Sequence, residues 1–164
     1  MGLSVRAAND ADAEAIRSIY NLEVLESTVT FDLVPRTLPD QLEWQHERSG
    51  AHVVLVADDD AGGIVGFGSL SAYKRRAAYS TTVEDSVYVR RDQQGRGVGR
   101  LLLDELVAVA TAHGFHAMMA RIVGGHDASI RLHAGAGFEI VGTEREIGRK
   151  FGRWLDVVVM QKLI

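Results

Sequence analysis

Three glycines separated by single residues are the feature of this sequence that points most directly to chemistry. Gly95, Gly97 and Gly99 stand between a β-rich apolar segment and an amphipathic segment with helical spacing. Glycine permits positive φ and has no Cβ, so backbone N–H groups can converge on an anion while the dipole of the following helix adds positive charge. The stretch predicts a phosphate-binding loop, with a plain helix-entry turn as the alternative.

The spacing of these glycines excludes two common phosphate-binding motifs. A dinucleotide fingerprint needs glycine at its sixth position, where Arg100 stands counting from Gly95 and Leu102 counting from Gly97. A nucleotide P-loop needs lysine followed by serine or threonine after its second glycine, and neither follows here. The ligand therefore belongs to another class of phosphate compound.

The loop Gln94-Gly95-Arg96-Gly97-Val98-Gly99 resembles the pyrophosphate-binding signature of the GNAT acetyltransferases. The chain also resembles, over nearly its whole length, the branch that acetylates phosphinothricin, methionine sulfoximine and methionine sulfone. The segments that carry this second resemblance are TVTFDLVPRT, AYKRRAAYSTTVEDSVYV, GGHDASIRLHAGAGF and KFGRWLDVVVMQ.

The resemblance implies a binding site for acetyl-coenzyme A. In this family the strand before the loop pairs through its backbone with the pantetheine arm, much as an added strand would; an ordinary core strand is the alternative role. The implied coenzyme-binding residues are Val87, Tyr88, Val89, Gln94, Gly95, Arg96, Gly97, Val98, Gly99, Arg100, His126 and Ser129. Two positions depart from the pattern, since many members have asparagine in place of His126 and glutamate in place of Ala134.

Glu84 is the residue that the resemblance implies as general base. Acetyl transfer needs a neutral nitrogen, whereas most amines are protonated near neutral pH, so a nearby group must accept a proton. Glu84 matches the family glutamate with this role, and a solvated acid at a strand start is its alternative reading. Asp85 is the neighbouring candidate, but adjacent strand residues face opposite ways, so only one of the two faces the acceptor.

His133 is implied as the group that protonates the departing thiolate. Many family members have a tyrosine in the second helix after the loop. At the matching position this chain has His133, and in this it resembles the phosphinothricin branch. Imidazole can donate a proton near neutral pH. The alternative is a helix histidine that only packs beneath the coenzyme.

The implied acceptor is a small, zwitterionic or net-anionic amino acid analogue. Arg76 matches an arginine of the branch, and a guanidinium can bind two oxygens of a carboxylate or phosphinate. If this segment is extended, Arg75 points the other way. The basic run of residues 74–76 argues against a cationic acceptor. The implied acceptor-binding residues are Thr28, Phe31, Lys74, Arg76 and Tyr79.

The elements that must position these residues alternate between strand and helix patterns. Strands are expected over residues 3–7, 52–57, 64–71, 83–90, 116–123, 138–145 and 154–162. Helices are expected after Asn9 or Asp10 and over residues 40–48, 99–113 and 127–135, with an irregular segment over 26–39. This order predicts an α/β (α+β) fold with a mixed sheet, and the resemblance implies about seven strands flanked by about four helices.

The composition predicts one globular domain over residues 1–164. The net charge of −4 comes from scattered charges of both signs, which disfavours nucleic acid as a partner. The chain has no cysteine, which excludes disulfides and an acyl-cysteine intermediate, and the remaining histidines show no ligand spacing, so no metal is predicted. Neither a signal segment nor an apolar run of about 18 residues is present, so no membrane partner and a cytoplasmic location are expected.

The implied function is transfer of acetyl from acetyl-coenzyme A to the α-amine of such an analogue, by direct attack in a ternary complex. Two alternatives stay open: acetylation of protein N-termini or another amine, and a non-catalytic coenzyme A-binding module. A homodimer is expected because the resembling enzymes commonly pair. Trp44 and Trp154 are candidate anchors for it, and each is equally a candidate core residue.

Overall fold

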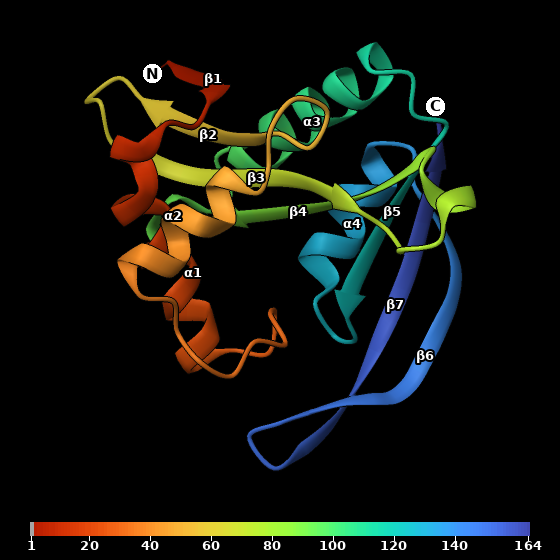
Figure 1. The fold of residues 1–164 in the computed structure, drawn as a ribbon. Coiled ribbons are helices and arrows are strands. Elements are labelled where there is room, and N and C mark those ends of the chain that lie inside the picture. The colour runs from red at the N-terminus through yellow and green to blue at the C-terminus, as the bar shows by residue number, and fades with distance from the viewer. Residues whose placement is uncertain (1) are drawn as a thin grey trace.

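The computed structural model describes residues 2–164, which form a seven-stranded sheet flanked by four α-helices (Figure 1). The strands are β1 (Leu3–Ala7), β2 (Val54–Asp59), β3 (Ile64–Ala72), β4 (Thr82–Val89), β5 (Ala117–Val123), β6 (Glu139–Lys150) and β7 (Arg153–Leu163). The helices are α1 (Ala13–Glu26), α2 (Leu38–His46), α3 (Val98–Ala112) and α4 (Asp127–Gly135). The predicted mixed α/β fold is confirmed.

The sheet has the strand order β1-β2-β3-β4-β5-β7-β6 and splits near its middle. Only β4 and β5 run parallel, because α3 carries the chain back between them. Their pairing ends where Glu84 meets Met119, and beyond it β5 runs steeply away from β4 (Figure 1). Over the described residues, the β5-facing edge of β4 from Asp85 to Val89 therefore has no strand partner.

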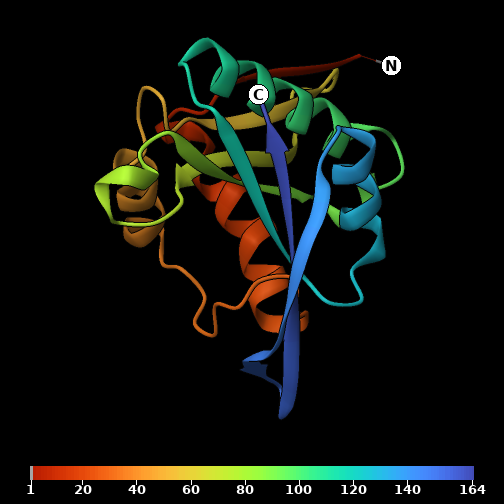
Figure 2. The ribbon, with the colours of Figure 1, turned by 90° about the vertical axis from the view of Figure 1, so that its right-hand side faces the viewer.

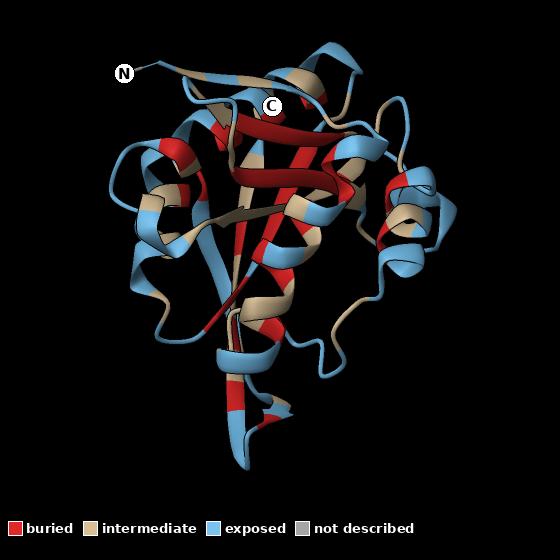
Figure 3. Cartoon of the chain, turned by 90° about the vertical axis from the view of Figure 1, so that its left-hand side faces the viewer, coloured by how far each residue is buried: buried red, intermediate tan, exposed pale blue. Residues whose placement is uncertain are grey.

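The two faces of the sheet carry separate cores, and the alternation of side chains along β2 explains why. Leu55 and Ala57 face α3 and pack with its buried leucines, whereas Val54 and Val56 face α1 and pack with Ile16. Figure 2 shows α3 (green) across the top of the molecule and α1 (orange-red) lower down, behind β5 and β7. Figure 3 shows the buried residues gathered in the central strands and along the helices.

Strand β6 is longer than the sequence predicts. It was expected to end at residue 145 but continues to Lys150, past a bulge where Glu146 has a φ of 49° and donates its backbone N–H to Asp156 Oδ1 at 2.8 Å. Because β5 pairs with β7 only as far as Val157, the rest of β6 and β7 is a two-stranded ribbon beyond the sheet (Figure 1). Charged residues and glycine over 144–149 hide the strand pattern in the sequence. Pairing with β7 keeps this segment extended.

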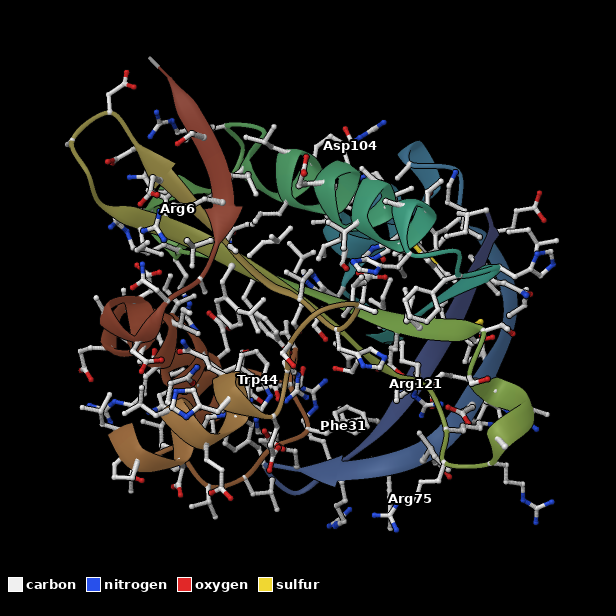
Figure 4. All side chains as sticks on the ribbon, turned by 45° about the horizontal axis from the view of Figure 1, so that its top comes forward. Arg6, Phe31, Trp44, Arg75, Asp104 and Arg121 are labelled. Atoms are coloured by element: carbon white, nitrogen blue, oxygen red, sulfur yellow. The ribbon has the colours of Figure 1, made fainter. Side chains whose placement is uncertain are left out.

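The segment before β4 forms no strand, so the condition under which Arg75 and Arg76 were expected to point opposite ways is not met. Arg76 is the N-cap of a 3-10 helix, Ala77–Tyr79, and both arginines are exposed. Local hydrogen bonds, such as that from Tyr79 N–H to the Arg76 carbonyl at 2.9 Å, hold this turn. They take the place of the pairing with a neighbouring strand that would make side chains alternate between two faces. Figure 4 shows Arg75 pointing outward.

The two tryptophans lie in different surroundings. Trp44 packs edge-on against Phe67 of the α1-side core, with ring centroids 6.2 Å apart. Trp154 is 60% exposed near the tip of the β6–β7 ribbon, with the Arg149 guanidinium over its ring. Of the two candidate anchors, only Trp154 therefore lies mainly at the surface.

Candidate active site

The glycine loop joins β4 to α3 in the geometry of a phosphate cradle. Gly95 and Gly97 have φ values of +77° and +87°, and a Cβ built on either would meet no atom within 4 Å. The backbone conformation, and not lack of space, therefore demands glycine. Gly97 is the N-cap of α3, so the first N–H groups of that helix are available beside the loop.

A cleft over this loop brings together most of the residues predicted to bind the coenzyme. Its lining includes Val87, Val89, Gln94, Gly95, Gly97, Val98, Gly99, Arg100, His126 and Ser129. Gln93, Ala128 and Leu132 also line it and were not predicted. Arg96 does not line it, and its guanidinium donates a hydrogen bond to the Gln93 side chain.

A second cleft continues along the open edge of β4, where β5 diverges. It shares Val87, Val89, Gln94, His126 and Ser129 with the first, and adds Tyr88, Asp85, Arg121 and His133. The two clefts thus form one groove from the glycine loop to the split in the sheet. A long ligand with phosphate at one end fits this shape, with its chain along unpaired strand backbone.

Glu84 lines neither cleft; it adjoins Asp85, where the groove ends, and faces the α1 side of β4. It is the last β4 residue paired with β5, and its partner is Met119. Burial raises the pKa of this half-buried carboxyl group; Arg121 opposes the rise and Asp85 adds to it. A carboxylate with a raised pKa is a better proton acceptor near neutral pH.

Arg121 is a cation beside Glu84 that the sequence did not reveal. It lies two residues beyond Met119 on the same strand, so its side chain takes the same face as Glu84. Its guanidinium is 2.6 Å from Glu144 Oε1, an ion contact without hydrogen-bond geometry, and its side chain is 32% exposed. Figure 4 shows Arg121 and Phe31 on one side of the sheet, opposite the helix that carries Asp104. Arg121 and Glu84 are distant in the sequence, and the pairing register of β4 with β5 brings them to the same face.

Asp85 and His133 meet on the opposite face of β4. Asp85 Oδ2 is 2.8 Å from His133 Nε2, and His133 Nδ1 is 2.8 Å from the Ser129 carbonyl oxygen. Burial alone would lower the pKa of His133, but the hydrogen bond and charge of Asp85 outweigh it and the pKa is raised. His126, nearer the glycine loop, has its pKa lowered by burial.

The residues predicted to bind the acceptor lie in two separate segments. Phe31 belongs to the α1–α2 loop and packs against Gly148 of β6, where a Cβ would lie 2.3 Å from its ring; Thr28 is half-buried in the same loop. Lys74 lies over the Tyr79 ring at 5.2 Å, in the exposed segment that contains Arg76. None of the five lines the groove itself.

A buried lysine fixes the α1–α2 loop against the ribbon. Lys150 of β6 is buried and donates to the Thr30 carbonyl oxygen at 2.9 Å, and burial lowers its pKa. Tyr20 bonds the Thr30 hydroxyl at 2.8 Å and donates to Asp32, and burial raises the pKa of Tyr20 to about 12. The loop that carries Thr28 and Phe31 is thereby held in one position.

The other histidines lie apart from this groove. His46 bonds Asp10 at 2.8 Å and His52 packs near Phe115. Over residues 2–164, no group of three or more His, Asp or Glu side chains is arranged to hold a metal ion. No helix of the same residues is long and apolar enough to cross a bilayer.

The parallel strands that split beside a glycine loop define a class of protein, and comparison with known families agrees. Residues 5–159 match the model of the acetyltransferase (GNAT) domain, so the chain belongs to the GNAT family. Both the resemblance and the fold expected from the sequence are confirmed.

Particular relatives lie in one branch of that family. The chain is 42% identical to L-methionine sulfoximine/L-methionine sulfone acetyltransferase of Pseudomonas aeruginosa, over 98% of this chain and 94% of that one. It is 39% identical to phosphinothricin N-acetyltransferase of Streptomyces coelicolor, over 94% and 92%. The crystal structure of a phosphinothricin acetyltransferase of Sinorhizobium meliloti in complex with AcCoA superposes with a TM-score of 0.96 at 38% identity, covering 100% of this chain and 89% of that one.

Proposed function

We propose that this protein transfers the acetyl group of acetyl-coenzyme A to the α-amine of a small amino acid analogue. Analogues of the methionine sulfoximine, methionine sulfone and phosphinothricin type are the proposed acceptors, in keeping with the named relatives. The observation that carries the proposal is the continuous groove from the phosphate cradle to the strand split beside Glu84.

The groove suits acetyl-coenzyme A as donor substrate. The glycine loop and the start of α3 would hold its pyrophosphate, and the free edge of residues 87–89 would pair with the amides of the pantetheine arm. The donor supplies a thioester carbonyl that an amine can attack. A relative of known structure binds the same donor.

Glu84 is the proposed general base. Its raised pKa and its place at the end of the groove support removal of the proton from an incoming ammonium group, directly or through water. The chain has no cysteine, which fits direct attack by the amine in a ternary complex.

His133 is the proposed source of the proton for the leaving thiolate. It lines the groove, and its raised pKa keeps the ring protonated over a wider pH range than a free histidine. Packing against Phe138, at a centroid distance of 5.0 Å, holds the ring in place.

Arg121 joins the predicted acceptor contacts in this proposal. An amino acid presents its carboxylate one carbon away from its amine, so a cation is needed close to the base. Arg121 shares a face with Glu84, and its ion contact with Glu144 leaves guanidinium N–H groups free to bind a carboxylate. Thr28, Phe31, Lys74, Arg76 and Tyr79 remain predicted contacts to the rest of the acceptor.

A homodimer built on the β6–β7 ribbon is also proposed. The ribbon extends beyond the sheet and exposes large apolar side chains, among them Ile147, Phe151 and Trp154. Such patches are typical of protein interfaces.

Initial-rate kinetics test the donor and the order of reaction. Thiol release should require both acetyl-coenzyme A and an amino acid analogue such as methionine sulfone, with intersecting double-reciprocal lines. Parallel lines would contradict direct attack. Donor binding by calorimetry without thiol release, for any amine offered, would instead identify a non-catalytic binding module.

A further inference from the structure

Asp85 and His133 form an almost fully buried pair between β4 and α4. Their side chains are 1% and 4% exposed, and the contact distance is 2.8 Å. The alternation that turns Glu84 toward α1 turns Asp85 toward α4. The proposed function gives Asp85 no role, although this residue lines the same groove as His133.

The contacts of the ring determine where its protons lie. A carbonyl oxygen only accepts, so His133 Nδ1 must donate to Ser129. His133 Nε2 lies 2.8 Å from Asp85 Oδ2, and the neighbouring carboxylate favours a proton on this ring nitrogen. The other groups near the ring are Phe138, the Ser129 hydroxyl at 3.5 Å and His126, whose charge would oppose protonation.

The second oxygen of Asp85 indicates that the pair is not there for stability alone. Asp85 Oδ1 is buried and has no hydrogen-bond partner in the protein. Burial of a carboxylate oxygen without a partner is unfavourable, and an apolar residue would complete the core at lower cost. Unsatisfied buried polar groups of this kind concentrate at functional sites.

We propose that Asp85 is a positioning residue for acetyl transfer, because its carboxylate fixes the orientation and proton state of the His133 ring at the wall of the groove. The inference rests on the proposed role of His133. With both ring N–H groups engaged inside the protein, His133 presents a fixed positive charge beside the groove. A proton can leave it only when the hydrogen bond to Asp85 or to Ser129 is exchanged.

Nuclear magnetic resonance of ring-labelled histidine tests the pair without the reaction. In the wild type, both His133 nitrogens should be protonated at neutral pH, with the signal identified by its loss in His133→Phe. In Asp85→Asn, the side-chain amide has the same shape and can donate a hydrogen bond to Nε2 of a neutral His133 ring. The titration midpoint of His133 should therefore move to lower pH. Glu84→Gln, the same change one residue away on the opposite face, is the matched control and should leave the midpoint near that of the wild type.

Kinetics of the same variant separate positioning from packing. In Asp85→Asn, kcat should fall by about 10²-fold, the lower end of what acid–base catalysis contributes, with little change in the KM for acetyl-coenzyme A. The basic limb of the pH–rate profile should move to lower pH together with the His133 titration. A shifted titration with unchanged kcat and profile would overturn the proposal.

Two further outcomes keep the inference distinct from the proposed function. A singly protonated His133 ring in the wild type at neutral pH would overturn it even if Asp85→Asn fails to fold. Failure of the wild type to acetylate any amine would remove the proposed function and with it the catalytic part of the inference. The resonance experiment would still report whether Asp85 holds the proton state of His133.

Discussion

Glu84 and Asp85 are adjacent carboxylates with separate surroundings. Glu84 faces Arg121 at the end of the groove, and Asp85 faces His133 beneath α4. Two groups of the same intrinsic chemistry can take separate parts in acid–base catalysis when their environments differ. The side that each residue faces on β4 is therefore the smallest feature on which the proposed mechanism depends.

Glu84→Gln should lower kcat by about 10²–10⁴-fold while leaving acetyl-coenzyme A affinity nearly unchanged, because it removes a proton acceptor that does not contact the coenzyme in our proposal. The pH profile should change as well. A base acts when deprotonated, so the wild-type rate should rise with pH through the raised pKa of Glu84, and this limb should vanish in the variant. Full turnover of the variant at every pH would refute the assignment.

Arg121→Ala should abolish the preference for a free carboxylate on the acceptor. The measurement is the ratio of kcat/KM for methionine sulfone to kcat/KM for its amide, determined for the wild type and for the variant. The amide has a lower amine pKa, but this difference is the same for both proteins and cancels when the two ratios are compared. The wild type should favour the acid by about 10- to 100-fold in kcat/KM, as expected for a hydrogen bond between charged groups. Arg75→Ala, at an exposed arginine that points outward, is the control. An unchanged ratio in Arg121→Ala would exclude it as the carboxylate contact.

At the scale of elements, the glycine loop should tolerate no side chain at Gly97. Gly97→Val forces a β-branched residue into φ near +87°, so the loop must change shape and acetyl-coenzyme A affinity should fall. Gly62→Val in the β2–β3 turn, where φ is +78°, is a matched control away from the groove. Both variants should lose stability in thermal unfolding, but calorimetry should show weaker coenzyme binding only for Gly97→Val. Equal affinity in a folded Gly97→Val protein would remove the loop from the site.

Elements with strong local signals were predictable from the sequence. Helix α3 begins one residue from its expected start because the glycines and the leucine spacing are local features. The 3-10 turn at Ala77–Tyr79 and the far half of β6 were not foreseen, since the first depends on local hydrogen bonds and the second on pairing with β7. The contact of Arg121 depends on the β4–β5 register, and the contact of Asp85 depends on the packing of α4. Neither feature can be recognised from the local sequence.

At the scale of the whole molecule, the β6–β7 ribbon should join two copies of the chain. Sedimentation at micromolar concentration should give twice the 17.9 kDa chain mass. Ile147→Asp should shift the equilibrium to the monomer by burying a charge in the interface. Leu25→Asp, at an equally exposed apolar position on α1, should not. A monomeric wild type, or a dimer that survives Ile147→Asp, would contradict the proposed interface.

The groove, the proposed base and the proposed acceptor side come together only in the complete fold. The glycine loop and Glu84 lie at opposite ends of β4, and α4 closes the groove between them. The proposed acceptor side instead combines β5 with the α1–α2 loop, which Lys150 of β6 holds by a hydrogen bond to the Thr30 carbonyl oxygen. The proposed acceptor preference therefore depends on the assembled molecule and follows from no single motif.

The most direct test of the central claim is a competition among acceptors for limiting acetyl-coenzyme A, with mass spectrometry of the products. The mixture would contain equal concentrations of methionine sulfone, spermidine and a peptide with a free N-terminus, with Glu84→Gln as the matched control. We predict that N-acetyl methionine sulfone will dominate and will nearly disappear with the variant. Preferential acetylation of the peptide or of spermidine would contradict the account.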